Sequence, residues 1–131
     1  AIARKIVDRA AAMGIPVEDV IIDCLALTVG ANSKAAAVTL EAVKSVKADL
    51  GVNQTLGASN VSYGLPRREV LNNAFIALAI SAGLTCPTVD VAKVRAAVVS
   101  TDLALGRDNY AMRYIKAYRE AEAAAKLAAA N

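Results

Sequence analysis

The chain has 131 residues, which is enough for one domain, and it is 56% hydrophobic and 21% charged, with a formal net charge of +3. It contains no histidine, which excludes Ser-His-Asp and Cys-His catalysis within this chain, and no apolar run approaches the roughly 18 residues of a membrane span. Its basic residues are scattered among acidic ones and only 4% of residues are aromatic, so we expect neither a nucleic acid nor a membrane as partner.

Helices and short strands are predicted to alternate along the chain. In chain order we expect a helix over 2–13, a strand over 20–27, a helix over 34–50, a strand over 52–58, a helix over 68–81, a strand over 84–90, and helices over 91–105 and 109–130. The helical start of the chain suggests that it begins within a fold.

Gly and Pro residues mark the ends of these elements. Most of the predicted helices are followed by a glycine at the position where a left-handed residue closes a helix. Asn32 or Ser33 is expected to cap the helix over 34–50, and Pro66 is expected at the first helical position before Arg68. Pro87 weakens the strand over 84–90, because proline cannot donate a ladder hydrogen bond.

Alternation of this kind predicts an α/β fold with about three parallel strands joined by right-handed crossovers. Three strands are too few for a closed barrel, which needs eight. The sequence contains no P-loop and no G-x-G-x-x-G fingerprint. Two architectures remain: a small open α/β sheet, or the C-terminal part of a (β/α)8 barrel.

Polar residues at the C-terminal ends of the predicted strands are the candidate functional residues, because parallel α/β folds place their chemistry there. Asp23, inside an apolar run, could accept hydrogen bonds from adjacent N–H donors such as an amino-pyrimidinone edge, or it could cap a neighbouring loop. Asn60 could hydrogen-bond a ring nitrogen, or it could be an ordinary turn residue. Asp90 is expected to cap the following helix.

Charged residues and thiols add two further expectations. Arg67 and Arg68 lie in the first turn of a helix, where cations oppose the macrodipole, so they hint at an anionic partner. Cys24 and Cys86 form no C-x-x-C pair, and no histidine accompanies them, so we expect no metal site. We expect two buried, reduced thiols in a cytoplasmic protein, since the chain starts without a signal-peptide pattern.

One stretch of the sequence resembles a known family, the pterin-binding methyltransferases. The likeness covers most of residues 15–119 and rests on Gly57-Ala58-Ser59-Asn60-Val61-Ser62-Tyr63-Gly64-Leu65-Pro66, followed by Arg68, Leu71-Asn72, Phe75, Leu78, Ala79 and Ala82-Gly83-Leu84. Upstream, the segment from Ile21 to Thr28 resembles the same family's sixth strand. The family includes the methyltetrahydrofolate:corrinoid methyltransferases and the folate domain of cobalamin-dependent methionine synthase.

The resemblance implies that residues 1–131 form the C-terminal portion of a TIM barrel of the dihydropteroate-synthase-like type. Its pterin site would lie at the mouth of the barrel, and its reaction would move a methyl group, in either direction, between N5 of methyltetrahydrofolate and the cobalt of a corrinoid (cobalamin) on a separate protein or domain. Asp23 would hold the pyrimidine edge, and Asn60 would be the catalytic residue at N5. The residues expected around the pterin are Gly57, Ser59, Asn60, Ser62 and Arg68.

The sequence also departs from the family, whose first half-barrel supplies another Asp and an Asn to the same pterin. We therefore expect an enzyme that is inactive without an N-terminal half-barrel or a second copy of itself, with a homodimer favoured. Dihydropteroate synthase itself fits poorly, because its loop lysine and final Arg-x-His are missing here. The alternative is a non-catalytic α/β half-barrel acting as a structural or partner-binding subunit.

Overall fold

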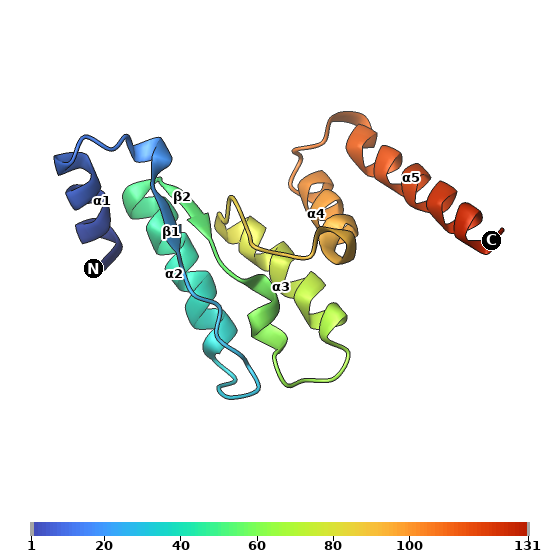
Figure 1. The fold of residues 1–131 in the computed structure, drawn as a ribbon, viewed down its shortest axis with the longest axis horizontal. Helices are drawn as coiled ribbons and strands as arrows, with labels where there is room; N and C mark the ends of the chain where they lie inside the picture. Colours follow the sequence, from blue (N-terminus) through green and yellow to red (C-terminus); the bar gives the residue numbers. More distant parts are fainter. Residues whose placement is uncertain (1, 131) are drawn as a thin grey trace. The chain divides into compact units, whose positions relative to one another are not determined.

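The computed structural model describes residues 2–130, and the chain separates into two compact units, Ala1–Val89 and Asp90–Asn131 (Figure 1). The first unit contains α1 (Ile2–Ala12), a 3-10 turn η1 (Val17–Asp19), β1 (Ile21–Asp23), α2 (Ala35–Leu50), β2 (Asn53–Thr55), η2 (Ala58–Ser62) and α3 (Arg68–Ala82). The second contains α4 (Val91–Ala104), η3 (Asn109–Ala111) and α5 (Met112–Ala129). The predicted alternation of helices and strands is confirmed in the first unit.

The two strands β1 and β2 are parallel, with Ile22 opposite Gln54. The third predicted strand is present only as a single bridge between Gly57 and Thr88. Its backbone does follow β2, since the N–H of Cys86 donates to the carbonyl of Gln54 at 2.9 Å. The ladder stops because the hydroxyl of Thr85, not a backbone carbonyl, accepts the N–H of Gln54 at 2.8 Å.

The first strand is shorter than the predicted span of 20–27. Asp23 ends it, because one of its carboxylate oxygens accepts the N–H of Leu25 at 2.8 Å and takes that donor out of the ladder. Leu25 then adopts a left-handed backbone with φ of 53°. A local side-chain bond therefore overrides the strand preference of this apolar run.

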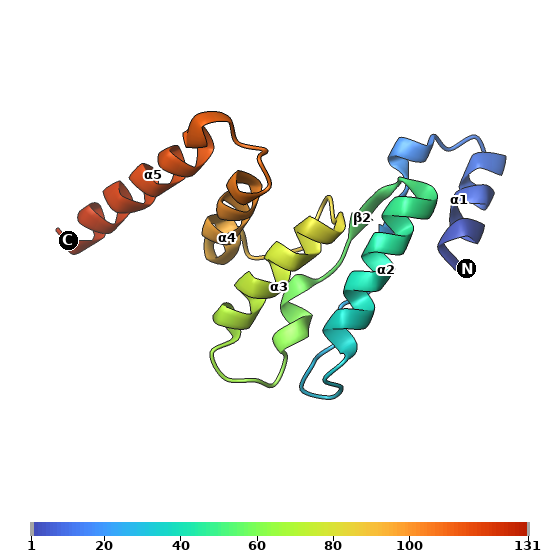
Figure 2. The same ribbon diagram turned by 180° about the vertical axis from the view of Figure 1, so that it is seen from behind.

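Helices α2 and α3 cover the same face of the strands, as the view in Figure 2 shows. Alternate strand residues point toward them and form the core, and the buried ones are Val20, Ile22, Val52, Gln54 and Leu56. The other face is uncovered, so Ile21 is 54% exposed and Leu25 is 66% exposed. Sequential parallel strands with helices on one face are the arrangement from which a barrel wall is built.

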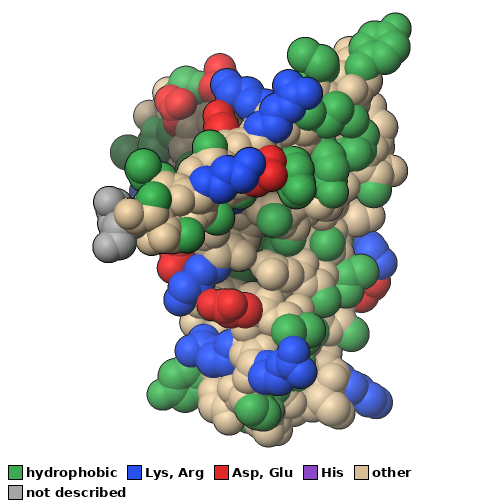
Figure 3. All heavy atoms as spheres, turned by 90° about the vertical axis from the view of Figure 1, so that its right-hand side faces the viewer, with side chains coloured by type: hydrophobic (Ala, Val, Ile, Leu, Met, Phe, Trp, Pro, Cys, Tyr) green, Lys and Arg blue, Asp and Glu red, His purple; other side chains and the backbone are tan. Residues whose placement is uncertain are grey.

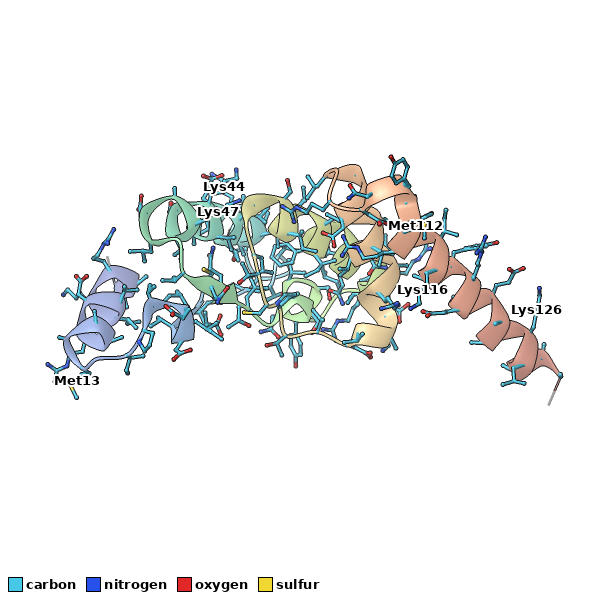
Figure 4. All side chains as sticks on the ribbon, turned by 90° about the horizontal axis from the view of Figure 1, so that it is seen from above. Met13, Lys44, Lys47, Met112, Lys116 and Lys126 are labelled. Carbon is cyan, nitrogen blue, oxygen red and sulfur yellow. The ribbon has the colours of Figure 1, made fainter. Side chains whose placement is uncertain are left out.

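The close contact between α2 and α3 explains one of the predicted helix ends. Gly83 closes α3 with φ of 119°, and the side chain of Lys47 on α2 covers its Cα, so that an added Cβ would collide with the Cδ of Lys47 (Figure 4). Asn32 forms a turn just before α2 by accepting the N–H of Lys34 at 2.9 Å, but Lys34 itself is the N-cap residue and no side chain caps the helix, so the predicted cap at Asn32 or Ser33 is wrong. Pro66 is not the first helical residue, because α3 begins at Arg68.

In the second unit, Asp90 caps α4 as expected by accepting the N–H of Ala92 at 3.2 Å. The predicted helix over 109–130 is broken, because Tyr110 and Ala111 have φ of 55° and 56°. Asp108 holds this break by accepting the N–H groups of Arg113 and Tyr114 at 3.0 and 2.9 Å. The new helix α5 starts after the break.

Two tyrosines of the last segment lie at the surface. Tyr110 is 95% exposed and Tyr118 is 64% exposed. On the side of the molecule seen in Figure 3, basic, acidic and hydrophobic side chains are intermixed. Within residues 2–130, no helix is long and apolar enough to cross a membrane.

Candidate functional site

The candidate site is built on two loops that follow β1 and β2 and are hydrogen-bonded to each other. The N–H of Val29 donates to the carbonyl of Val61 at 3.0 Å, and the hydroxyl of Thr28 donates to the carbonyl of Tyr63 at 2.8 Å. Because the strands are parallel, both loops leave the same edge of the sheet. The segment that carries Asp23 and the segment that carries Asn60 therefore form one rim.

Asn60 lies in the 3-10 turn η2, which its own backbone stabilises. Its N–H donates to the carbonyl of Gly57 at 3.0 Å, and its carbonyl accepts the N–H of Tyr63 at 3.1 Å. The side chain is exposed and has no hydrogen-bond partner among residues 2–130. The carboxamide thus presents a free donor and a free acceptor at the rim.

Gly57 provides the room for that carboxamide. A Cβ built on Gly57 would lie 3.1 Å from Nδ2 of Asn60, which is closer than ordinary van der Waals contact. The backbone φ of Gly57 is −76°, a value that any residue can adopt. The glycine is therefore needed for space beside Asn60 and not for backbone freedom.

Asp23 is exposed at the end of β1, on the face of the sheet that the helices leave uncovered. One of its oxygens caps the turn at Leu25, so the loop-capping interpretation holds for that oxygen. The second oxygen has no partner within the described part of the chain, which leaves one carboxylate acceptor available to a ligand.

Two threonines extend this polar edge, and sequence reasoning missed both. Thr55 is the register partner of Asp23 on the neighbouring strand, and its hydroxyl lies 3.3 Å from the hydroxyl of Thr88. The three side chains therefore share the uncovered face. The period-2 alternation back from Gly57 identifies Thr55 as a residue of this face, but Thr88 depends on a pairing that the sequence does not specify.

Ser62 and Arg68 hold the turn together from the side of α3. Ser62 is fully buried, and its hydroxyl donates to the carbonyl of Ser59 at 3.2 Å and accepts from Nε of Arg68 at 3.0 Å. Arg68 also donates from Nη2 to the carbonyl of Ser59 at 2.9 Å, and its guanidinium lies 5.8 Å from the ring centroid of Tyr63. These contacts engage the hydroxyl of Ser62 and the Nε and Nη2 groups of Arg68 in holding the turn.

Two polar candidates remain, Arg67 and Asp90. Arg67 precedes α3 in a left-handed conformation with φ of 50°, and its side chain is exposed. Asp90 belongs to the second unit, where it caps α4. Among the described residues, no group of three or more Cys, Asp or Glu side chains is placed to hold a metal ion.

The prediction that both thiols are buried is wrong. Cys24 is half-buried and Cys86 is exposed. Each contacts Gln54: the thiol of Cys24 donates to Oε1 at 3.2 Å, and that of Cys86 donates to the backbone carbonyl at 3.2 Å. Burial, and to a lesser degree the negative charge of Asp23, raises the pKa of the Cys24 thiol.

Comparison with known proteins identifies relatives of this chain. The profile of the family described as pterin binding enzyme matches residues 1–90, which nearly coincide with the first compact unit. The methylcorrinoid:tetrahydrofolate methyltransferase of Eubacterium limosum is 31% identical over 83 residues, covering 62% of this chain and 30% of that protein. The methionine synthase of Mycobacterium leprae (strain TN) is 33% identical over 98 residues, covering 70% of this chain and 8% of that protein. The matched part of the chain thus spans less than a third of either relative.

Proposed function

Because this chain belongs to the pterin-binding enzyme family, we propose that it forms part of a methyltransferase that acts on methyltetrahydrofolate and a corrinoid protein. The methyl group would move, in either direction, between N5 of the folate and the cobalt of the corrinoid. The observation that carries the proposal is the hydrogen-bonded rim that presents the free carboxamide of Asn60 beside the strand end of Asp23.

Asp23 and Asn60 would divide the recognition of the pterin between them. The free carboxylate oxygen of Asp23 suits the adjacent N–H groups of the pyrimidine edge, because an ionised carboxylate offers only acceptors. The carboxamide of Asn60 suits N5, because it can either donate to this nitrogen or accept from it. Gly57 and Ser59 would lie against the pterin in the same loop, and Ser62 and Arg68 would support it by holding the backbone of that loop.

The proposed catalytic role of Asn60 follows from the charge that develops on N5 as the methyl group leaves. A carboxamide can change which of its atoms faces N5 without gaining or losing a proton. It would therefore stabilise the changing charge by hydrogen bonding alone, which fits a rim that has no histidine. Its side chain is exposed and has no hydrogen-bond partner within the described residues, which is compatible with this adjustment.

We further propose that residues 1–131 supply the C-terminal portion of a TIM barrel. Within residues 2–130, β1 pairs with β2 on one edge only, and the uncovered face exposes Ile21 and Leu25. An unpaired strand edge beside exposed apolar side chains favours pairing with more sheet. An N-terminal half-barrel or a second copy of this chain would provide it, together with the rest of the pterin site.

The corrinoid would be carried by a partner protein or domain, and its cobalt would accept or donate the methyl group. The role of this chain in the transfer would be to hold the pterin so that N5 faces the partner.

Light scattering on the isolated chain tests the proposal that the chain needs an N-terminal half-barrel or a second copy of itself. We expect masses above 13.5 kDa or heterogeneous association, whereas a stable, monodisperse 13.5 kDa species would contradict it.

The test of the proposed function is a titration of 5-methyltetrahydrofolate into the protein, alone and together with an N-terminal half-barrel, followed by a methyl-transfer assay with a corrinoid protein. We expect Asn60→Ala to lower the transfer rate about 10²-fold while it changes pterin affinity much less. Asn109→Ala, in the second unit, is the matched control and should leave both unchanged.

Equal losses of rate and affinity in Asn60→Ala would contradict the N5 role. The absence of pterin binding in the reconstituted barrel would contradict the proposed enzymatic function. It would favour a non-catalytic, partner-binding half-barrel instead.

A further inference from the structure

Thr28 lies in the loop after β1, and its hydroxyl joins this loop to the one that carries Asn60. It donates to the carbonyl of Tyr63 at 2.8 Å and accepts the N–H of Gly30 at 3.2 Å. The hydroxyl therefore acts as both donor and acceptor, and these two hydrogen bonds fix its orientation.

Tyr63 is the residue through which this contact reaches Asn60. Its N–H donates to the carbonyl of Asn60 at 3.1 Å, while its own carbonyl receives the hydroxyl of Thr28. A second hydrogen bond, from the N–H of Val29 to the carbonyl of the fully buried Val61, joins the same two loops. Thr28 thus holds the C-terminal end of η2 in place.

The other end of η2 is held from α3, where Arg68 donates to the carbonyl of Ser59 at 2.9 Å. Asn60 lies between these two fixed ends, and its side chain has no hydrogen-bond partner of its own within residues 2–130. The direction of the carboxamide therefore depends on the backbone of the turn, on Gly57 beside it, and on the residues that hold the turn.

We propose that Thr28 is a positioning residue for Asn60, acting through the backbone of Tyr63, in the methyl transfer proposed above, on which this inference rests. A reacting group has to be held within roughly 0.5 Å of its productive geometry, and small displacements lower rates strongly. Loss of the Thr28 hydroxyl leaves the carbonyl of Tyr63 without its donor and loosens the turn. The pterin contacts of Asp23 are untouched.

The test compares Thr28→Val, which keeps the shape and removes the hydroxyl, with Thr28→Ser, which keeps the hydroxyl, in the intact protein that contains this chain. We expect Thr28→Val to lower kcat about tenfold, with the KM for methyltetrahydrofolate within about twofold, and Thr28→Ser to restore kcat. Thr101→Val, which removes a hydroxyl bonded to Ala97 within α4, is the control. An unchanged kcat in Thr28→Val, or equal losses in both Thr28 variants, would overturn the proposal.

A double-mutant cycle separates positioning from a general structural role. If Thr28 acts through Asn60, Thr28→Val should reduce the residual rate of an Asn60→Ala protein less than twofold. A tenfold loss in both backgrounds would overturn the inference and leave the proposed function intact. Absence of methyl transfer in the unmodified protein would overturn both together.

Discussion

The Cα of Gly57 lies against the carboxamide of Asn60, so closely that a methyl group on Gly57 would come within 3.1 Å of Nδ2. The two residues face each other across the first turn of η2, which is closed by a hydrogen bond from the N–H of Asn60 to the carbonyl of Gly57. Gly57 thus lacks a side chain at the position where one would crowd the carboxamide of Asn60.

Gly57→Ala is expected to reduce methyl transfer without unfolding the protein. The backbone at this position accepts alanine, because φ is −76°, but the added methyl group displaces the Asn60 amide by a few tenths of an ångström. We expect a fall of about tenfold in kcat and a nearly unchanged Tm, measured by steady-state kinetics and thermal melting. An equal effect of Gly57→Ala in an Asn60→Ala protein would show that the methyl group acts elsewhere.

Ser62→Ala should mainly affect stability. The buried hydroxyl bonds to the carbonyl of Ser59 and to Arg68, so its removal leaves these groups under-satisfied at a cost of about 1–2 kcal/mol. Urea unfolding measures this loss, and Ser33→Ala on the exposed loop before α2 is the matched control. If Ser62→Ala instead weakens pterin binding at unchanged stability, Ser62 contacts the ligand directly, and the proposal that it only holds the turn is wrong.

The two thiols should differ in reactivity toward iodoacetamide near pH 8. Burial first, and the charge of Asp23 second, raise the pKa of Cys24, so its reactive thiolate is scarce, whereas Cys86 is exposed. We expect mass spectrometry to find Cys86 modified first. Asp23→Asn should speed the labelling of Cys24, and Asp90→Asn should not. Faster labelling of Cys24 than of Cys86 in the unmodified protein would refute this assignment.

Acid should weaken the start of α5 through Asp108. The N–H of Arg113, with smaller contributions from the N–H of Tyr114 and the Arg113 guanidinium, outweighs burial and holds the pKa of Asp108 below its ordinary value. A carboxyl whose pKa is lower in the folded state contributes stability that is complete above its unfolded pKa and that is lost as the pH falls through the folded pKa.

Circular dichroism melts between pH 2 and pH 5 measure this effect. The unmodified protein should lose helical stability on acidification more steeply than Asp108→Asn, which has no charge to lose. Asp8→Asn in α1 controls for the removal of one negative charge. Parallel curves for the unmodified protein and Asp108→Asn would exclude Asp108 as the source of the acid sensitivity.

The helices of the first unit could be predicted from sequence because their signals are local. Gly51 and Gly83 end α2 and α3, and each is a neighbour in the chain of the helix that it ends. The strand ends could not be predicted, for two different reasons. The bond from Leu25 to Asp23 that ends β1 is local, but the apolar run around it favours a longer strand. The third strand depends on Thr85 reaching across to Gln54, which is far away in the chain.

The residues of the candidate site also differ in whether the sequence alone identifies them. Gly57, Ser59 and Asn60 form a contiguous motif, so the sequence identifies them together. The inward direction of Ser62 depends on the turn η2, and the alignment of Thr55 with Asp23 depends on strand register. The register is a property of pairing between segments far apart in the chain, and η2 is a local turn that interrupts the strand pattern, so periodicity within one segment specifies neither.

Pro87 gives the two edges of the small sheet different properties. Neighbouring residues of a strand direct their N–H groups to opposite sides, and those of Cys86 and Thr88 point to β2, so position 87 faces outward with no donor. No proline interrupts the outer edge of β1. The missing donor at Pro87 makes its edge the poorer template for an added strand, so extension of the sheet is favoured at the edge of β1.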